Sequence, residues 1–131
     1  MTPLRRVAMA ASVGLLLACS GTTGPVAGTL RVNLADPNNG QDGALMLVLS
    51  APVVPTSVAA GAGLTLWGAP VTTANATLVL TGTVSTGTIL TLQVDDINKV
   101  AQYSATLQQV ASSSDYSLRL PLAGYSLTVT K

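Results

Sequence analysis

The chain has 131 residues, of which 48% are hydrophobic and only 8% are charged, and it contains no His, no Phe and no Glu. An ordinary soluble domain carries roughly 25% charged residues, so these few scattered cations exclude the basic stripe that nucleic-acid binding requires. Thr, Ser, Gly and Ala replace the missing charge. Because Thr and Val favour strands while Gly and Pro favour turns, this composition predicts one all-β domain.

The N-terminal segment has the pattern of a secretory signal. Arg5 and Arg6 precede an apolar run of twelve residues from Val7 to Ala18. This length fits the apolar region of a signal peptide and falls short of the ~20 residues of a membrane-spanning helix. A short buried core helix is the alternative, but the arginine pair before the run and the Gly/Thr-rich break after it fit processing better.

The end of this run has a specific pattern. Leu16-Leu17-Ala18-Cys19 resembles the lipobox of bacterial lipoproteins. The resemblance implies that the signal peptide comprises residues 1–18, that cleavage falls between Ala18 and Cys19, and that a diacylglyceryl group on the Cys19 thiol anchors the protein to a membrane. Two or three acyl chains give a durable anchor. Cys19 is also the only cysteine of the chain, so a disulfide within the chain is excluded.

The residues around the lipobox indicate a route and a destination. By the same resemblance, Ser20 stands where an Asp would mark retention in the inner membrane, so the outer membrane is the expected location. Arg5-Arg6 also fits a twin-arginine signal, but the following Val-Ala-Met lacks the expected character, and Sec export is favoured. Residues 19–28 are rich in Gly, Ser and Thr, which predicts a lipidated cysteine followed by a flexible tether.

The hydrophobic period changes to two from Thr29 onward, which indicates strands. Residues 36–43 contain several turn formers, and the continuous apolar run from Ala44 to Leu49 predicts a central strand covered on both faces. Residues 85–87 predict a tight hairpin, and residues 95–99 a turn or a single helical turn. Tyr103, Tyr116 and Tyr125 are expected to point inward. The expected strands are 29–34, 44–49, 64–67, 76–84, 89–94, 103–110, 116–120 and 125–130.

About eight short strands separated by turns are typical of a β-sandwich or a small barrel. The strand spacing and the segment DGALMLVLSAP after an opening strand loosely resemble cohesin-like and other immunoglobulin-like modules of bacterial surface proteins. That resemblance implies a single antiparallel β-sandwich over residues 29–131. It carries no information about a ligand, since fold does not imply function.

The residues needed for common catalytic sites are missing. Without His, neither a Ser-His-Asp arrangement nor His-ligated zinc is available, and lipidation of Cys19 leaves no thiol nucleophile. No phosphate-binding loop or dinucleotide fingerprint occurs in the sequence. A Ser/Lys dyad stays open, but Lys99 and Lys131 lie in no recognisable motif. We therefore predict a protein that is not an enzyme and has no cofactor other than the acyl lipid.

Two loops gather the oxygen ligands that calcium prefers. The candidate cation-binding residues are Asp36, Asn38, Asp42, Asp95 and Asp96. The first loop lacks the spacing of an EF-hand, and Asp and Asn equally serve turns through bonds to the backbone. Turn formation is the favoured interpretation, with calcium as the alternative.

Trp67 is the only tryptophan and precedes a Gly-Ala-Pro turn. It could stack on a sugar ring, but we favour a role in capping one end of the core. Together these observations predict a non-catalytic binding or interaction module at the cell envelope, whose partner is an envelope protein or a polysaccharide. The alternative is a structural envelope component that assembles through its sheet edges, which few charges protect. The sequence leaves the oligomeric state open.

Overall fold

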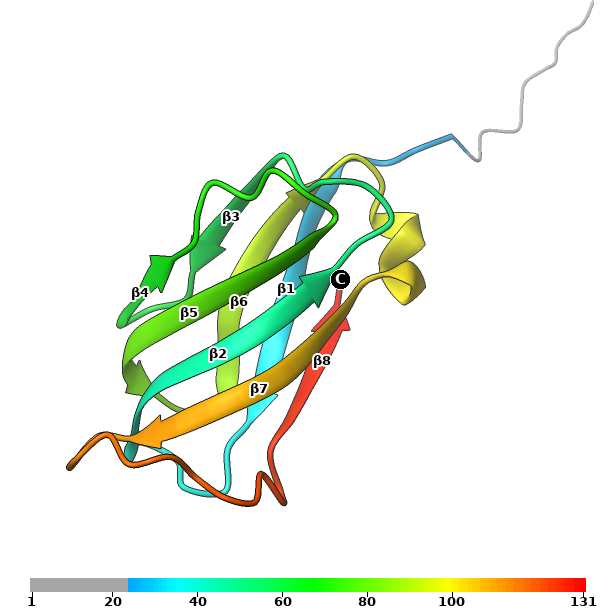
Figure 1. Ribbon diagram of the computed structural model, residues 1–131. Coiled ribbons are helices and arrows are strands. Elements are labelled where there is room, and N and C mark those ends of the chain that lie inside the picture. Colours follow the sequence, from blue (N-terminus) through cyan, green and yellow to red (C-terminus); the bar gives the residue numbers. More distant parts are fainter. Residues whose placement is uncertain (1–23) are drawn as a thin grey trace, which may run out of the picture.

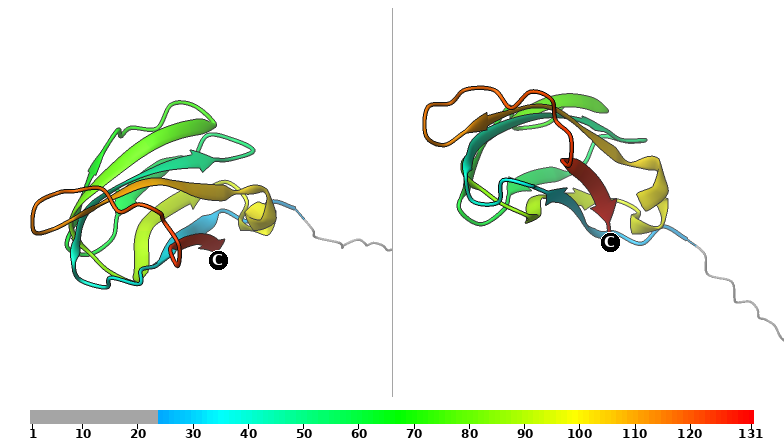
Figure 2. Two further views of the ribbon diagram at one scale, coloured as in Figure 1. Left: turned by 60° about the horizontal axis from the view of Figure 1, so that its bottom comes forward. Right: turned by 90° about the horizontal axis from the view of Figure 1, so that it is seen from below.

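The structure, a computed structural model, describes residues 24–131 and is built from two antiparallel four-stranded sheets packed face to face. One sheet has the strand order β3-β6-β1-β8 and the other β4-β5-β2-β7. Figures 1 and 2 show the sheets as two layers. The elements are β1 (Gly28–Ala35), β2 (Asp42–Ser50), β3 (Ser57–Ala60), β4 (Leu64–Trp67), β5 (Asn75–Val84), β6 (Gly87–Val94), the 3₁₀ helix η2 (Ile97–Gln102), β7 (Ser104–Ser112) and β8 (Ser126–Thr130).

The core lies between the layers and consists mainly of leucine and valine. Alternate residues of the strands point inward, because successive side chains of a strand lie on opposite faces. β1 and β2 each contribute three apolar residues that are at most 2% exposed. The predicted inner residues of β5 and β6 are also buried. The buried core cluster is Leu30, Val32, Leu34, Leu45, Leu47, Leu49, Leu78, Leu80, Val84, Ile89, Leu90, Leu92, Val94, Tyr103 and Val110. The prediction of an eight-stranded antiparallel β-sandwich is confirmed.

The predicted hairpin at residues 85–87 is wrong. β5 pairs with β4 and β2, whereas β6 pairs with β1 and β3, so the link between β5 and β6 crosses from one sheet to the other. Gly87 does adopt a positive φ of 133°. A glycine near two alternating segments marks a sharp change of direction, but it does not specify whether the second strand pairs with the first or crosses the core.

The predicted strand at residues 116–120 is also wrong. Leu118 forms only an isolated bridge to Ala111, and Tyr116 has a φ of 57° and an exposed fraction of 64%. Tyr116 and Leu118 therefore do not point inward, whereas Tyr103 is buried and Tyr125 packs against the core. The eighth strand is β3, which the sequence analysis missed because its four residues, SVAA, are too short and too small for a clear alternation.

β2 is a central strand, as predicted, but it is covered on one face only. Leu45, Leu47 and Leu49 are buried between the sheets, whereas Ala44, Met46 and Val48 are partly exposed on the outer face. A two-layer sandwich has no third layer to cover that face. An apolar run that would suit a strand buried on both sides therefore leaves apolar side chains at the surface.

The two ends of the sandwich differ. At one end the described chain enters beside η2, where the Ile97 amide donates to the Val26 carbonyl. η2 confirms the predicted helical turn, and Asp96 caps it by accepting from the Asn98 amide. At the other end lie the loop of residues 36–41 and the long loop of residues 113–125, far from the chain entry (Figure 1). Within residues 24–131, no helix is long and apolar enough to cross a membrane.

Candidate interaction surface

The structure separates the predicted site residues into distant groups. Asp36, Asn38 and Asp42 lie at the end of the sandwich where β1 leads into β2, whereas Asp95 and Asp96 lie at the opposite end, after β6. The two acidic loops therefore do not form one site. The predicted cleavage and lipidation residues, Ala18 and Cys19, fall outside the described residues.

Asp42 is the centre of a buried polar network that joins the two loops at this end. Its side chain is completely buried, and one carboxylate oxygen accepts from Arg119 Nε at 2.8 Å. The other oxygen accepts from the Tyr125 hydroxyl at 2.7 Å, and Asn38 Nδ2 donates to that hydroxyl at 2.9 Å. Burial alone would raise the pKa of Asp42, but the bonds from Tyr125 and Arg119 outweigh it and hold the pKa below its usual value.

Asp36 lies beside this network, and its pKa is shifted in the opposite direction from that of Asp42. Its side chain is 7% exposed, and its Oδ2 atom is buried without a hydrogen-bond partner. Burial raises the pKa of Asp36 to about 6; the Asn38 amide, which donates to Oδ1 at 2.7 Å, opposes this shift, and nearby Asp42 adds to it. The neutral form of Asp36 avoids an unpartnered buried charge at Oδ2 beside the charged Asp42.

These contacts favour turn formation over calcium binding at both loops. Both oxygens of Asp42 already accept hydrogen bonds, one of them from a guanidinium cation. Asp96 is engaged with the backbone of η2 and with the Val26 amide. Among residues 24–131, no group of three or more His, Cys, Asp or Glu side chains is arranged to hold a metal ion.

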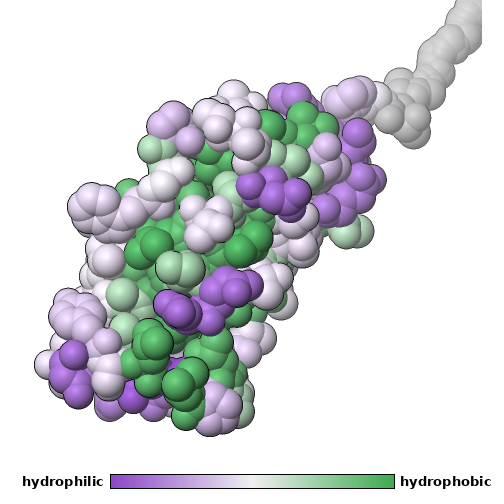
Figure 3. Space-filling view, viewed as in Figure 1, coloured by the Kyte–Doolittle hydropathy of each residue, from purple (hydrophilic) through white to green (hydrophobic). Residues whose placement is uncertain are grey.

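The outer face of the β4-β5-β2-β7 sheet is uncharged and carries a group of apolar side chains among Thr, Ser, Asn and Gln; we call it the apolar face. One row across its four strands consists of Trp67, Val79, Met46 and Gln109, which occupy directly paired positions. The flanking rows add further small apolar and Thr side chains, and none of the outward-facing residues of these four strands is charged. In the space-filling view, apolar side chains gather along the middle of this face (Figure 3). The outward apolar set is Ala44, Met46, Val48, Trp67, Val79 and Ala111.

The outer face of the other sheet is polar, and its side chains form hydrogen bonds with one another. Thr29 accepts a side-chain hydrogen bond from Gln93 at 2.9 Å, and Asn33 forms side-chain bonds to Thr130 and Thr88, also at 2.9 Å. Such cross-strand polar pairs suit a sheet face in contact with water. Both faces belong to one small domain with few charged residues, so the low charge of the chain does not explain why only one of them carries grouped apolar side chains. The apolar face is therefore the unusual one.

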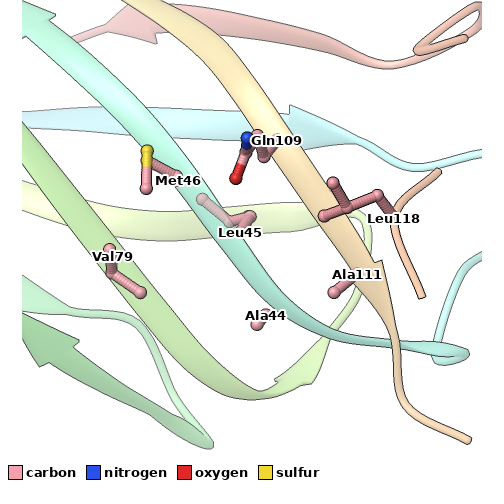
Figure 4. A pocket seen from close by; sticks show the side chains of 7 residues that line it. All are labelled: Ala44, Leu45, Met46, Val79, Gln109, Ala111 and Leu118. Carbon is pink, nitrogen blue, oxygen red and sulfur yellow. The ribbon is translucent and has the colours of Figure 1, made fainter. Parts of the chain in front are cut away.

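The loop of residues 113–125 extends the apolar face at its lower end. Leu118 is 49% and Leu120 is 83% exposed, and the backbone amide of Arg119 donates to the Val110 carbonyl at 2.8 Å. Leu118 lies beside Ala111 at the rim of a shallow hollow of about 110 Å³ on the sheet face (Figure 4). The hollow is lined by Ala44, Leu45, Met46, Val79, Gln109, Ala111 and Leu118.

A second, polar hollow of about 390 Å³ lies against the same loop. Ser112, Ser113, Ser114, Ser117, Asp115, Gln41 and Arg119 line it. Hydrogen bonds from Ser112 and Ser117 lower the pKa of Asp115 to about 2, so this carboxylate is committed to its own loop. Asp36 and Asp42 line neither of these two hollows, whereas Arg119, which binds Asp42, lines the polar one.

The prediction that Trp67 caps one end of the core is wrong. It lies 57% exposed on β4, with Nε1 donating to Thr81 Oγ1 at 3.0 Å. Large apolar side chains are rarely left at the surface in contiguous groups unless they contact another molecule. Trp67 therefore belongs to the apolar face.

No protein-family model, no curated protein sequence and no solved structure matches this chain. The immunoglobulin-like and cohesin-like resemblance therefore stays a prediction.

The sequence analysis missed Met46, Val48 and Val79 as surface residues. The available signal was a conflict between two predictions, since an uninterrupted apolar run suits a strand buried on both faces, whereas a single two-layer sandwich covers each strand on one face only. Every second residue of ALMLVL had to be exposed. The exposure of Leu118 and Leu120 was not predicted, because the alternation of residues 116–120 is typical of a strand with its leucines buried.

Proposed function

We propose that this protein is a non-catalytic interaction module, exported and lipid-anchored at the cell envelope through Cys19, that binds its partner with the outer face of the β4-β5-β2-β7 sheet. The observation that carries the proposal is the contrast between this uncharged apolar face and the hydrogen-bonded polar face of the other sheet. Association through such a surface is driven by removing apolar area from water.

The chemistry of the face favours a protein as partner over a polysaccharide. Its apolar residues other than Trp67 are aliphatic, and sugar rings are bound mainly by stacking on aromatic faces. The Trp67 Nε1 donor is already bonded to Thr81, so it is not free for a sugar hydroxyl. Aliphatic side chains on a pleated surface instead complement the aliphatic side chains of another protein.

The position of the face also suits an anchored module. The described chain enters at the η2 end, and the 113–125 loop with Leu118 and Leu120 lies at the opposite end. A tether at the N-terminal side would therefore leave this loop and the adjoining apolar face accessible from outside the membrane.

Edge-to-edge assembly, the alternative, has less support. The edge strands β3 and β4 have four residues each and β8 has five, and short edges template pairing poorly. The longer edge strand β7 is interrupted by a register shift opposite Met46 and Leu47, and residues 117–119 pair with its last residues.

Site-specific photocrosslinking in cells that make the full chain tests the proposal. A photoreactive amino acid at Val79 probes the apolar face, and one at Thr128 probes the opposite face on the edge strand β8. We expect adducts from position 79 and few from position 128. Adducts from position 128 alone would favour edge assembly, and the absence of adducts from position 79 would refute the proposed surface.

A further inference from the structure

We infer that the η2 end of the sandwich lies against the membrane that anchors the chain, with the side chains of Val26, Val53 and Val54 in contact with the lipid. This inference rests on the proposed function, because it needs the anchor on Cys19, and it goes beyond that function by assigning a second surface and its partner. The 113–125 loop, at the opposite end, then points away from the membrane. We call the inferred contact surface the anchor end; it comprises residues 24–27, 51–56 and 95–102.

Hydrogen bonds between backbone segments bring the three parts of the anchor end together. The Val26 carbonyl accepts from the Ile97 amide at 2.8 Å, and the Val26 amide donates to Asp96 Oδ1 at 3.3 Å. The Thr56 amide donates to the Gln93 carbonyl of β6 at 2.8 Å. Because β1 and β3 lie on either side of β6, the chain entry and the β2–β3 loop lie on either side of the turn before η2. Figure 1 shows the β2–β3 loop close to η2 and to the point where the described chain enters.

The anchor end carries exposed apolar side chains in an uncharged loop. Val26, Val53 and Val54 are each at least 38% exposed. The β2–β3 loop has the sequence APVVPT, in which Thr56 is the only polar residue, and Pro52 is exposed as well. Grouped apolar side chains at a surface are typical of contact with another molecule or with a membrane.

The length of chain between the anchor and the sandwich favours lipid as the occupant. Val26 is fixed to η2 through its backbone, and Cys19 lies seven residues earlier. Seven residues span at most about 25 Å when fully extended, which is about the length of β1, with eight residues at about 3.3 Å each. Acyl chains on Cys19 therefore keep the anchor end within about one domain length of the lipid. This confinement raises the effective concentration of lipid at the anchor end, so a small apolar surface suffices for contact.

The charges of the anchor end indicate that apolar contact, and not attraction to anionic headgroups, holds it at the membrane. Its charged residues are Asp95, Asp96 and Lys99, so one lysine minus two aspartates gives −1. Asp96 accepts hydrogen bonds from the backbone amides of Val26 and Asn98. Anionic lipids attract clusters of Lys and Arg, and this end has a single lysine. Valine side chains instead enter the boundary between headgroups and acyl chains, where burial of apolar area provides the binding free energy.

Contact between lipid and a fluorescent label tests the inference in the full, lipidated protein. Acylation blocks the thiol of Cys19, the only cysteine, so an environment-sensitive dye reacts only with the cysteine introduced by Val54→Cys or by Leu120→Cys. Both positions are exposed, and they lie at opposite ends of the sandwich. In phosphatidylcholine vesicles that contain a spin-labelled phospholipid, we expect the label at position 54 to be quenched and blue-shifted. The label at position 120 should be quenched several-fold less.

A second substitution distinguishes apolar contact from proximity to the anchor. Val53→Asp, added to Val54→Cys, should weaken the lipid contact at least about three-fold, because it removes a partly exposed valine from the contact. Leu120→Asp introduces the same charge at the opposite end and should leave the contact unchanged, with circular dichroism confirming the fold of both variants.

Three results would overturn the inference: no quenching at position 54, equal quenching at positions 54 and 120, or equal effects of the two aspartates. A several-fold rise in quenching when phosphatidylglycerol is added would also overturn it, since the contact would then depend on charge. The mass of the purified protein separates this inference from the proposed function. If acyl chains are present and position 54 does not contact lipid, the proposed function stands and the anchor-end contact is wrong; if acyl chains are absent, the proposed anchor and this inference both fail.

Discussion

Replacement of Asp36 by Asn should make the stability of this protein nearly independent of pH between 4 and 7. The Asp36 carboxyl is buried at the end of the sandwich, and its folded-state pKa is about 6 instead of the usual 3.8. The neutral form suits this position, because it avoids a second buried charge beside that of Asp42.

The magnitude follows from this pKa shift. Between pH 3.8 and 6 the folded chain holds a proton on Asp36 that the unfolded chain releases, so stability falls as pH rises. The stabilisation is fully present below 3.8 and is lost as pH passes about 6, which amounts to about 3 kcal/mol over the window. Asp42 contributes in the opposite sense, since its pKa is lowered, and its contribution is lost only below the window.

The carboxamide introduced by Asp36→Asn retains the acceptor for the Asn38 amide and does not titrate. We therefore expect the free energy of unfolding of the wild type, measured in urea, to fall from pH 4 to pH 7. Its Tm in thermal unfolding should fall on the order of 10 °C over the same range. The stability of Asp36→Asn should stay nearly constant, so that it is the more stable protein at pH 7. Asp95→Asn, at an exposed position, serves as the control and should keep the wild-type slope. A wild-type profile without a decline, or an Asp36→Asn profile with the same decline, would refute the reasoning.

Three further predictions concern the network and the anchor. Tyr125→Phe removes a hydrogen bond from the buried Asp42 carboxylate and should cost about 1–3 kcal/mol in urea unfolding, whereas Tyr116→Phe, at an exposed position, should cost nothing measurable. Cys19→Ala should remove the acyl chains and leave the signal peptide uncut, which is seen as the full-length mass; a fully processed, membrane-bound variant would contradict the lipoprotein prediction. Millimolar calcium should leave the Tm of a soluble form that begins at Thr22 unchanged, and a rise of several degrees would restore the loop carboxylates as ligands.

The strands that formed as predicted are those whose alternation is strong. Leu30, Val32 and Leu34 in β1 alternate with polar neighbours, and Leu78, Leu80 and Val84 in β5 do so except at Val79. Burial of one face removes these apolar side chains from water. Segments with weak or misleading alternation were misjudged. Residues 116–120 alternate as strongly as a strand, yet the network around Asp42 fixes Arg119 at the loop end and leaves Leu118 and Leu120 outside the core.

The amino-acid sequence by itself determined the all-β class, the leucine-rich interior and seven of the eight strands, because period-two alternation and turn residues are local properties. It also placed the predicted anchor at Cys19, which depends on a short contiguous motif. Only the tertiary structure decided how the strands divide between two sheets, that Asp36 and Asp42 meet Arg119 and Tyr125, and which side of β2 faces solvent. These features depend on pairing between residues far apart in the chain, and the apolar face that we propose as the interaction surface exists only because no third layer covers it.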